Sequence, residues 1–199
     1  MERLTAVFNA NDQEQLWKEC NAFSIKQKGN PKAYKNLLQN ADFELLRNGE
    51  NAAAAMMADW KKSNFASWSF WCRNYGKCGM VKEGDSNCAF LDTTDNACFL
   101  QQVETEPHSK YIVRCRVKIE NPSKSDATIT VRWRRADGNW AMAHDLKFFA
   151  PKNMTPDTWV TIEGCFAAPE NVGKLTLQLG TTACEGKVYY DHAELYRVE

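Results

Sequence analysis

The 199-residue chain lacks an excess of charge of either sign and lacks any long apolar run. Its 25 lysine and arginine residues balance 25 aspartate and glutamate residues, so no overall field draws it to nucleic acid or to an anionic membrane. No continuous apolar stretch follows the first residues, which excludes a secretory signal within the chain and any membrane-spanning helix. We therefore expect neither a nucleic-acid partner nor a membrane partner.

Motifs of enzymes and zinc sites are also missing. The chain has no phosphate-cradling glycine loop, no HExxH and no GxSxG, and its three histidines are scattered. It has no CxxC pair, so zinc-finger spacing is absent. We expect no catalysis by this chain. A lyase acting on polysaccharides is the enzyme class that stays open, because β-sandwiches also serve such enzymes.

Eight cysteines leave two interpretations open. They indicate a compartment that permits disulfides, or they are small buried hydrophobic residues. Cys115 shares the parity of the apolar residues around it, so we interpret it as a core thiol. Cys72, Cys78 and Cys88 lie close in sequence beside turn residues, and one disulfide among them is a hypothesis.

A helix is predicted from Asn11 to Lys28. Its apolar positions give an approximate face: Leu16, Trp17, Cys20, Phe23 and Ile25. A lone helix cannot bury Trp17 and Phe23, so it packs on the following domain or is the remnant of a preceding one. We assign residues 1–35 to a helical extension or linker and residues 36–199 to the main domain, and we expect a piece of a multidomain protein.

From Asn36 onward, short alternating segments separated by Gly, Asn, Asp, Ser and Pro are typical of an all-β sandwich. Residues 51–58 are an exception, and their alanines favour a short helix or an ordered loop. The predicted strands are 97–103, 111–119, 127–135, 159–166, 174–179 and 187–196.

Alternation assigns faces within these strands. Ile129, Val131 and Trp133 share one side, which makes Trp133 a core residue, while Arg132 and Arg134 share the other. The strand at 111–119 likewise shows one apolar side and one basic side. If both basic sides belong to one sheet, their guanidinium groups can donate paired hydrogen bonds to sugar hydroxyls or uronic-acid carboxylates. The alternative is a solvated face balanced by nearby acids.

Several loose motifs occur in the order used by jelly-roll sugar-binding domains. They are Asn40-Ala41-Asp42-Phe43-Glu44, residues 99–103, residues 111–118, residues 159–166 and Tyr189-Tyr190-Asp191. Together they resemble the carbohydrate-binding modules of families four, nine, sixteen and twenty-two, within the galactose-binding-like superfamily. The resemblance covers about residues 36–199 and implies a jelly roll, an all-β sandwich of two antiparallel sheets.

The resemblance also implies a function. Such modules bind a polysaccharide or oligosaccharide without cleaving it, and they are usually appended to secreted glycoside hydrolases, which they concentrate on the polymer. We therefore expect a monomeric module, a covalently linked catalytic domain and a secreted or cell-surface parent protein. The alternative is an interaction sandwich that docks through an apolar patch to a neighbouring catalytic domain or a protein partner.

Aromatic residues support sugar binding independently, because sugar rings present flat C–H faces that stack on Trp and Tyr. Trp140 is the strongest candidate, since the Asp137-Gly138 turn signal before it places the indole near a loop tip or a sheet rim. One of Trp60, Trp68 and Trp71 should also reach solvent. The candidate sugar-binding residues are Trp140, Trp68, Trp71, Tyr75, Arg132, Arg134, His144 and Gln178.

A structural calcium is common in modules of this kind, and the resemblance implies one here. The matching carboxylates are Glu44 and Asp191, with Asp42 and Asp85 as weaker candidates. Calcium takes several oxygen ligands, so carboxylates far apart in sequence suit it. Many relatives carry two consecutive acids in the closing strand, where this chain has Asp191-His192. The alternative is that Glu44 and Asp191 cap turns or pair with Lys187.

Overall fold

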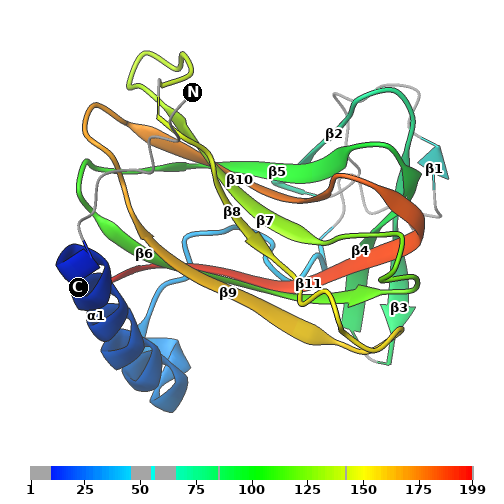
Figure 1. The fold of residues 1–199 in the computed structure, drawn as a ribbon, viewed down its shortest axis with the longest axis horizontal. Coiled ribbons are helices and arrows are strands. Elements are labelled where there is room, and N and C mark those ends of the chain that lie inside the picture. The colour runs from blue at the N-terminus through cyan, green and yellow to red at the C-terminus, as the bar shows by residue number, and fades with distance from the viewer. Residues whose placement is uncertain (1–9, 46–54, 57–65, 85, 142, 199) are drawn as a thin grey trace.

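Alternating strands form two antiparallel sheets that pack face to face (Figure 1). The computed structural model describes residues 10–45, 55–56, 66–84, 86–141 and 143–198. One sheet has the order β1-β3-β4-β11-β6-β9 and the other the order β2-β5-β10-β7-β8. The predicted sandwich of two antiparallel sheets is confirmed. The strands are β1 Ala55–Met56, β2 Ser69–Cys72, β3 Lys77–Glu83, β4 Ser86–Thr94, β5 Ala97–Glu104, β6 Lys110–Ile119, β7 Thr128–Arg134, β8 Leu146–Phe149, β9 Val160–Ala167, β10 Lys174–Thr181 and β11 Cys184–Val198.

The core lies between the two sheets, and period-two alternation fills it. The residues predicted to point inward from β6 and β7 are all buried there: Val113, Cys115, Val117, Ile129, Val131 and Trp133. Phe99 of β5 contacts the rings of Phe43, Phe70 and Tyr190. The predicted core positions of Trp133 and Cys115 are therefore confirmed.

All six predicted strands are present, whereas β1, β2, β3, β4 and β8 were not predicted. The expected helix or loop at residues 51–58 is wrong at Ala55 and Met56, which pair with Cys78 and Lys77 of β3. Pairing with β3 outweighs the helix propensity of alanine at these two positions. The rest of that run, like Trp60, lies outside the described residues.

Helix α1 spans Ala10–Gly29 and lies beside one end of the six-stranded sheet, and a short 3-10 helix, Pro31–Ala33, follows it (Figure 1). The buried residues of α1, Leu16, Cys20 and Phe23, pack against Ile112 of β6 and Tyr196 of β11. The helix thus packs on the sandwich, although the domain boundary at residues 35 and 36 stays a prediction. No described helix is both long enough and apolar enough to span a bilayer.

The apolar face of α1 is narrower than predicted. Trp17 and Ile25 are 50% and 75% exposed, because burial follows the spacing of Leu16, Cys20 and Phe23, one position in each turn. The prediction that Trp17 and Ile25 share the buried face is therefore wrong.

A buried arginine joins α1 to the six-stranded sheet. Arg114 of β6 is 4% exposed and donates to Ser24 Oγ at 2.6 Å and to Gln27 Oε1 at 2.9 Å, both on α1. It also forms ion pairs with Glu163 and Glu194. These partners compensate a charge that would otherwise be costly to bury.

The two basic sides predicted from the sequence lie on different sheets, because β6 belongs to the six-stranded sheet and β7 to the five-stranded sheet. Each outward cation of β6 has an acidic partner: Arg114 has Glu163 and Glu194, Arg116 has Asp191, and Lys118 has Glu83. A shared basic face across both strands is thus not formed.

All eight cysteines are free thiols. Cys78 pairs with Leu91 and Cys88 with Val81 in the β3–β4 hairpin, so the two cysteines are three residue pairs apart, about 10 Å along the strands. A disulfide requires Cα atoms within about 7 Å. Cys78 also faces the core, whereas Cys88 packs with Phe90 on the other side of the sheet. The hypothesis of a disulfide among Cys72, Cys78 and Cys88 is not supported.

A thiol reagent added to the unfolded protein is expected to react with all eight cysteines. In the folded protein Cys78 and Cys88 should react slowly at mildly alkaline pH, because burial raises the pKa of both thiols to about 12 and the thiolate is the reactive form. A count two below the total in the unfolded protein would show a disulfide.

Substituting Phe23 with alanine is expected to lower the free energy of unfolding by about 3 kcal/mol, the usual cost of emptying a buried aromatic site. Ile25→Ala is the matched control on the same helix and should change it by less than about 0.5 kcal/mol, since Ile25 is exposed. Urea titration followed by circular dichroism measures both. Equal losses in the two variants would contradict the observed orientation of α1.

Candidate functional site

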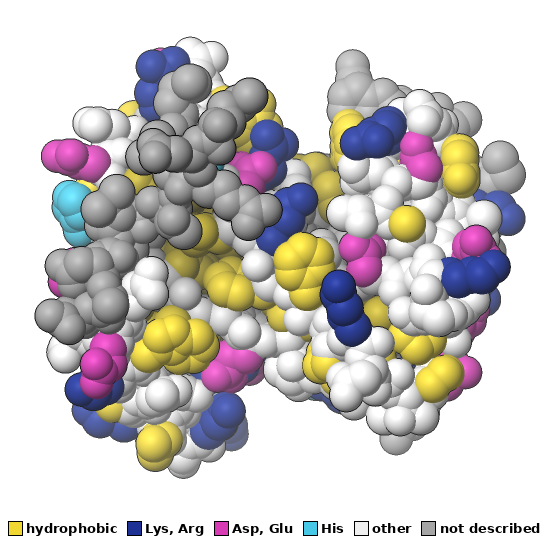
Figure 2. All heavy atoms as spheres, viewed as in Figure 1, with side chains coloured by type: hydrophobic (Ala, Val, Ile, Leu, Met, Phe, Trp, Pro, Cys, Tyr) yellow, Lys and Arg dark blue, Asp and Glu magenta, His cyan; other side chains and the backbone are white. Residues whose placement is uncertain are grey.

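A groove of about 570 Å³ crosses the outer face of the five-stranded sheet. Figure 2 shows the surface hollowed on this side of the molecule. All five strands of the sheet and the β7–β8 loop contribute to it, and its side chains include Trp71, Arg132, Arg134, Trp140, Asp145, Lys147, Thr176 and Gln178. Five of the eight predicted sugar-binding residues meet here: Trp71, Arg132, Arg134, Trp140 and Gln178.

The outward side chains of β7 and β10 form a polar part of the groove floor, while the inward side chains of the same strands are apolar and buried. Leu175, Leu177 and Leu179 of β10 are fully buried, which turns Thr176 and Gln178 outward. The strand register places Thr176 opposite Arg132 and Gln178 opposite Thr130. Hydroxyl, amide and guanidinium groups therefore lie in adjacent rows across the sheet, as a ligand rich in hydroxyl groups requires.

Trp140 lies at the rim of the sheet on the β7–β8 loop. The loop turns at Gly138, whose φ of 85° favours glycine, and Arg135 N donates to Asn139 O at 2.9 Å. An isolated bridge then pairs Trp140 with Arg134. The predicted position of Trp140 near a turn and a sheet rim is confirmed, and its side chain is 43% exposed.

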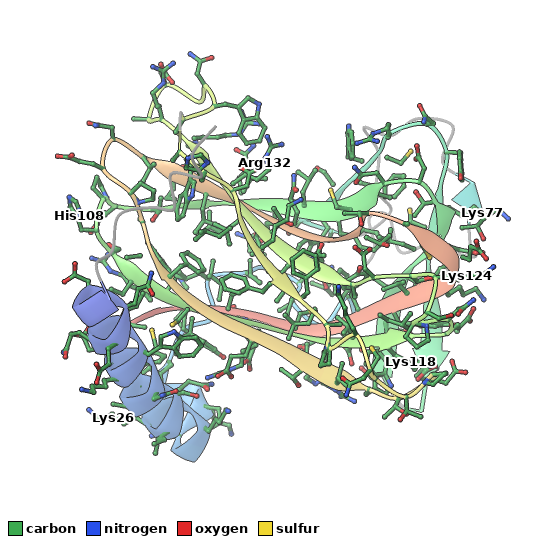
Figure 3. The ribbon with its side chains drawn as sticks, in the orientation of Figure 1. Lys26, Lys77, His108, Lys118, Lys124 and Arg132 are labelled. Atoms are coloured by element: carbon green, nitrogen blue, oxygen red, sulfur yellow. The ribbon has the colours of Figure 1, made fainter. Side chains whose placement is uncertain are left out.

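The Trp140 ring stacks on both arginines of β7. The guanidinium carbons of Arg132 and Arg134 lie 4.1 Å and 3.8 Å from its ring centroid, within the range of cation–π attraction. Arg132 Nε also donates to Asp145 Oδ2 at 3.0 Å, and Arg134 Nη1 donates to Gly138 O at 2.7 Å. In Figure 3 Arg132 points away from the six-stranded sheet. The arrangement holds the aromatic ring and the guanidinium groups in fixed positions.

Trp71 lines the groove from β2, at the opposite edge of the sheet. It pairs with Cys98 of β5 and faces away from the buried Phe70, as alternation predicted. The strands that carry Trp71 and Arg132 are three spacings apart, about 14 Å. A ligand that contacts both edges must be longer than one sugar ring.

Three predicted residues lie outside the groove. Trp68 is fully buried and stacks on Phe43 with ring centroids 5.2 Å apart, so its assignment as a sugar-binding residue is wrong. It shares the inward side of its segment with Phe70. Tyr75 and His144 are exposed but do not line the groove. His144 instead borders an apolar depression between α1 and β8.

Sequence reasoning missed several groove residues, among them Asp145, Lys147 and Thr176. Thr176 lies two residues before Gln178 and therefore on the same side of the strand, so the alternation that predicted Gln178 could also have predicted Thr176. Asp145 precedes β8 and Lys147 lies within it, and this strand of four residues is too short to show alternation. Two buried polar atoms of the groove residues, Thr176 Oγ1 and Arg134 Nε, have no hydrogen-bond partner among the described residues. Each such atom costs about 1–3 kcal/mol.

A second cluster lies where the turn at residues 40–43 meets the closing strand β11. His192 Nδ1 is 2.8 Å from Asp191 Oδ2 and 3.7 Å from Asp42 Oδ1. A β-bulge between Asp191 and Glu194 interrupts the pairing of β11 with β6, and Ala193 N donates to Ala41 O at 3.0 Å. The bulge brings two consecutive residues to one site. Asp42, Asp191 and His192 form a group that can hold a metal ion.

The other predicted metal ligands do not join this group. The Glu44 carboxylate accepts hydrogen bonds from Ser86 Oγ at 3.2 Å and Asn87 N at 2.8 Å, so Glu44 caps the start of β4 instead. Asp85 lies outside the described residues. Asp191 pairs with Arg116, 3.8 Å from Oδ2 to Nη1, rather than with Lys187.

Comparisons with known proteins identify a family. The family model CBM_4_9_1, described as BppA domain 1, matches residues 46–195. No curated protein matches the chain in sequence.

Similar solved structures include both enzymes and binding domains. The enzymatically active domain of bacteriophage CBA120 tailspike protein 4 has a TM-score of 0.59 at 12% identity over 82% of this chain. A cyclase from Fischerella sp. TAU has a TM-score of 0.52 at 11% identity over 80% of this chain and 95% of its own. The CBM22-1 xylan-binding domain of Paenibacillus barcinonensis Xyn10C has a TM-score of 0.49 at 16% identity over 70% of this chain and 91% of its own. Of the tailspike chain itself, the match with this protein covers 21%. Identities this low establish the shared fold and nothing about activity.

Proposed function

The chain belongs to the CBM_4_9_1 family, described as BppA domain 1, and we propose that it is a non-catalytic carbohydrate-binding module. It binds a polysaccharide or an oligosaccharide in the groove on the five-stranded sheet. The observation that carries this proposal is the convergence of Trp71 and Trp140 on one groove. The two indoles offer apolar surface to sugar rings, and the polar floor between them offers hydrogen bonds to hydroxyl groups.

The lining of the groove supports binding without bond cleavage. Hydrolysis of a glycosidic bond usually needs two carboxyl groups that flank it. Among the described residues that line the groove, Asp145 is the one carboxylate, and it is paired with Arg132. About a fifth of the tailspike chain and nearly the whole cyclase share this fold, so the fold alone does not distinguish an enzyme from a binding module.

The module would act by raising the local concentration of an attached enzyme on its polymer. We propose a covalently linked glycoside hydrolase as the partner, in a secreted or cell-surface parent protein. Secretion, the attached enzyme and the monomeric state rest on the family resemblance and stay predictions.

An apolar depression favours a second candidate function, docking to a neighbouring domain. It has a volume of about 730 Å³ between α1 and the β8–β9 edge, and the exposed Trp17 borders it. Such a patch suits a protein interface. If the folded protein retains no glycan, docking through this surface replaces glycan binding as the proposed function.

Calcium, the ion that the resemblance implies, does not fit the donors that the structure brings together. Calcium takes six to eight oxygen ligands, whereas the group supplies two carboxylates and an imidazole, and imidazole suits zinc, copper or nickel better. Both oxygens of Asp191 also contact His192, one through its backbone N–H and one through Nδ1. We therefore do not propose a structural calcium at this group of residues.

Trp71→Ala is expected to weaken glycan binding about 10-fold or more, because it removes one of the two aromatic stacking surfaces of the groove. Tyr75→Ala is the control, since Tyr75 is an exposed aromatic residue that lies outside the groove. Affinity electrophoresis against neutral and uronic-acid polysaccharides measures both. Equal weakening in the two variants, or no binding by the folded wild type, would contradict the proposed site.

Removing calcium with EGTA, or adding millimolar calcium, is expected to shift the melting temperature by less than about 1 °C, since a ligand stabilises only what it binds. Differential scanning fluorimetry measures the shift. Asp42→Asn is the informative variant because Asp42 is exposed and its loss should leave the fold intact. A rise of several degrees with calcium that disappears in Asp42→Asn would contradict this expectation.

A further inference from the structure

The charge of the groove is unbalanced, although the charge of the chain is balanced. The described lining residues include three cations, Arg132, Arg134 and Lys147, and one carboxylate, Asp145. Asp145 pairs with Arg132 at 3.0 Å. Neither Arg134 nor Lys147 has an acidic partner among the described residues. The groove thus keeps two cations without counter-charge.

The cations of β6, on the opposite face of the sandwich, provide a contrast. Arg114, Arg116 and Lys118 project from the outer face of β6, and each forms an ion pair with a carboxylate. Arg134 and Lys147 form no such pair among the described residues. A ligand that carries negative charge could supply the missing partner.

Arg134 is prepared to receive an anion. Trp140 stacks on its guanidinium at 3.8 Å, and Gly138 O accepts from Nη1 at 2.7 Å, so its plane is fixed while Nε, a donor, is buried without a partner. Thr176 lies on the neighbouring strand and is 2% exposed. Its Oγ1 also lacks a partner among the described residues. The third such atom, Tyr190 Oη, lies in the core. Two of the three unpaired atoms therefore belong to residues that line one groove.

We propose that the groove selects acidic polysaccharides and that Arg134 and Lys147 bind their acidic substituent, a uronate carboxylate or a sulfate ester. The proposal rests on the proposed function, glycan binding in this groove. A fixed guanidinium donates two parallel hydrogen bonds to a planar or tetrahedral anion. Lys147 adds a second positive charge from β8, where it pairs with Thr130. Trp71 and Trp140 hold the sugar rings.

The test compares polymers that differ only in charge. Polygalacturonate is paired with its fully methyl-esterified form, and dextran sulfate with dextran, so that the two arms separate a carboxylate from a sulfate ester. In one arm or the other, the wild type is expected to bind the acidic polymer at least 10-fold more tightly than the neutral one. Affinity electrophoresis or calorimetry at physiological salt measures the ratio, because salt screens nonspecific attraction.

Three variants assign the preference to the groove. Arg134→Gln and Lys147→Gln should each reduce the acidic-to-neutral ratio several-fold, because each variant removes a positive charge from the groove. Asp145→Asn should raise the ratio, because it frees Arg132 from its carboxylate partner. Lys26→Gln is the control: Lys26 is an exposed cation on α1, on the other side of the molecule in Figure 3, and its loss should leave the ratio unchanged.

The outcomes separate this inference from the proposed function. Binding of neutral polymers, xylan included, with no acidic preference would overturn the inference and leave glycan binding standing. An acidic preference that survives in the Arg134→Gln Lys147→Gln double variant would also overturn it, because the anion would then bind elsewhere. A folded wild type that retains none of these polymers would overturn the proposed function and the inference together.

Discussion

The packing of the five-stranded sheet against the six-stranded sheet is the constraint on which the candidate site depends. Side chains alternate along a strand, so burial of Ile129, Val131 and Trp133 leaves the outer face as the one place for Arg132 and Arg134. The same rule in β10 turns Thr176 outward. A slip of one residue in either strand would exchange the core with the floor of the groove. The polar floor is therefore as strongly specified as the core itself, although most of its side chains contribute little to folding.

The two outer faces of the sandwich differ in how the polar side chains on them are partnered. On the six-stranded sheet, Arg114 donates hydrogen bonds to Ser24 and Gln27 of α1, and carboxylates complete the network. The chain itself thus supplies the partners of this buried arginine. On the five-stranded sheet no helix of the described residues covers the groove, and Arg134 Nε and Thr176 Oγ1 are buried without partners among them. Native structures satisfy nearly all buried polar atoms, and this is one reason why we propose that a ligand completes this face.

Local sequence patterns predicted most of this fold but not its pairing. Strands with several alternating residues, such as β6 and β7, were found because their period is visible within the strand. β8 was not found, because four residues are too few to show a period. The sheet to which β6 and β7 each belong depends on contacts between residues far apart in sequence, such as Leu175 with Trp133, and no local pattern contains that information. Trp68 and Trp71 illustrate the limit: alternation separated them correctly, yet only the pairing of Phe70 with Phe99 shows which of them faces the core.

Trp71 and Trp140 are both groove tryptophans, but they differ in how the fold supports them. Trp71 lies on a strand whose pairing with β5 fixes its position regardless of its side-chain contacts. Trp140 lies on a loop, and its ring is also a stacking partner of Arg132 and Arg134. Removing the Trp140 ring would therefore remove a stacking partner of both guanidinium groups as well as a surface for the ligand, whereas removing the Trp71 ring deletes a surface alone. In the complex that we propose, charge recognition and ring stacking are coupled at the β7–β8 edge and separate at the β2 edge, so the two ends of the groove would contact different features of one polymer.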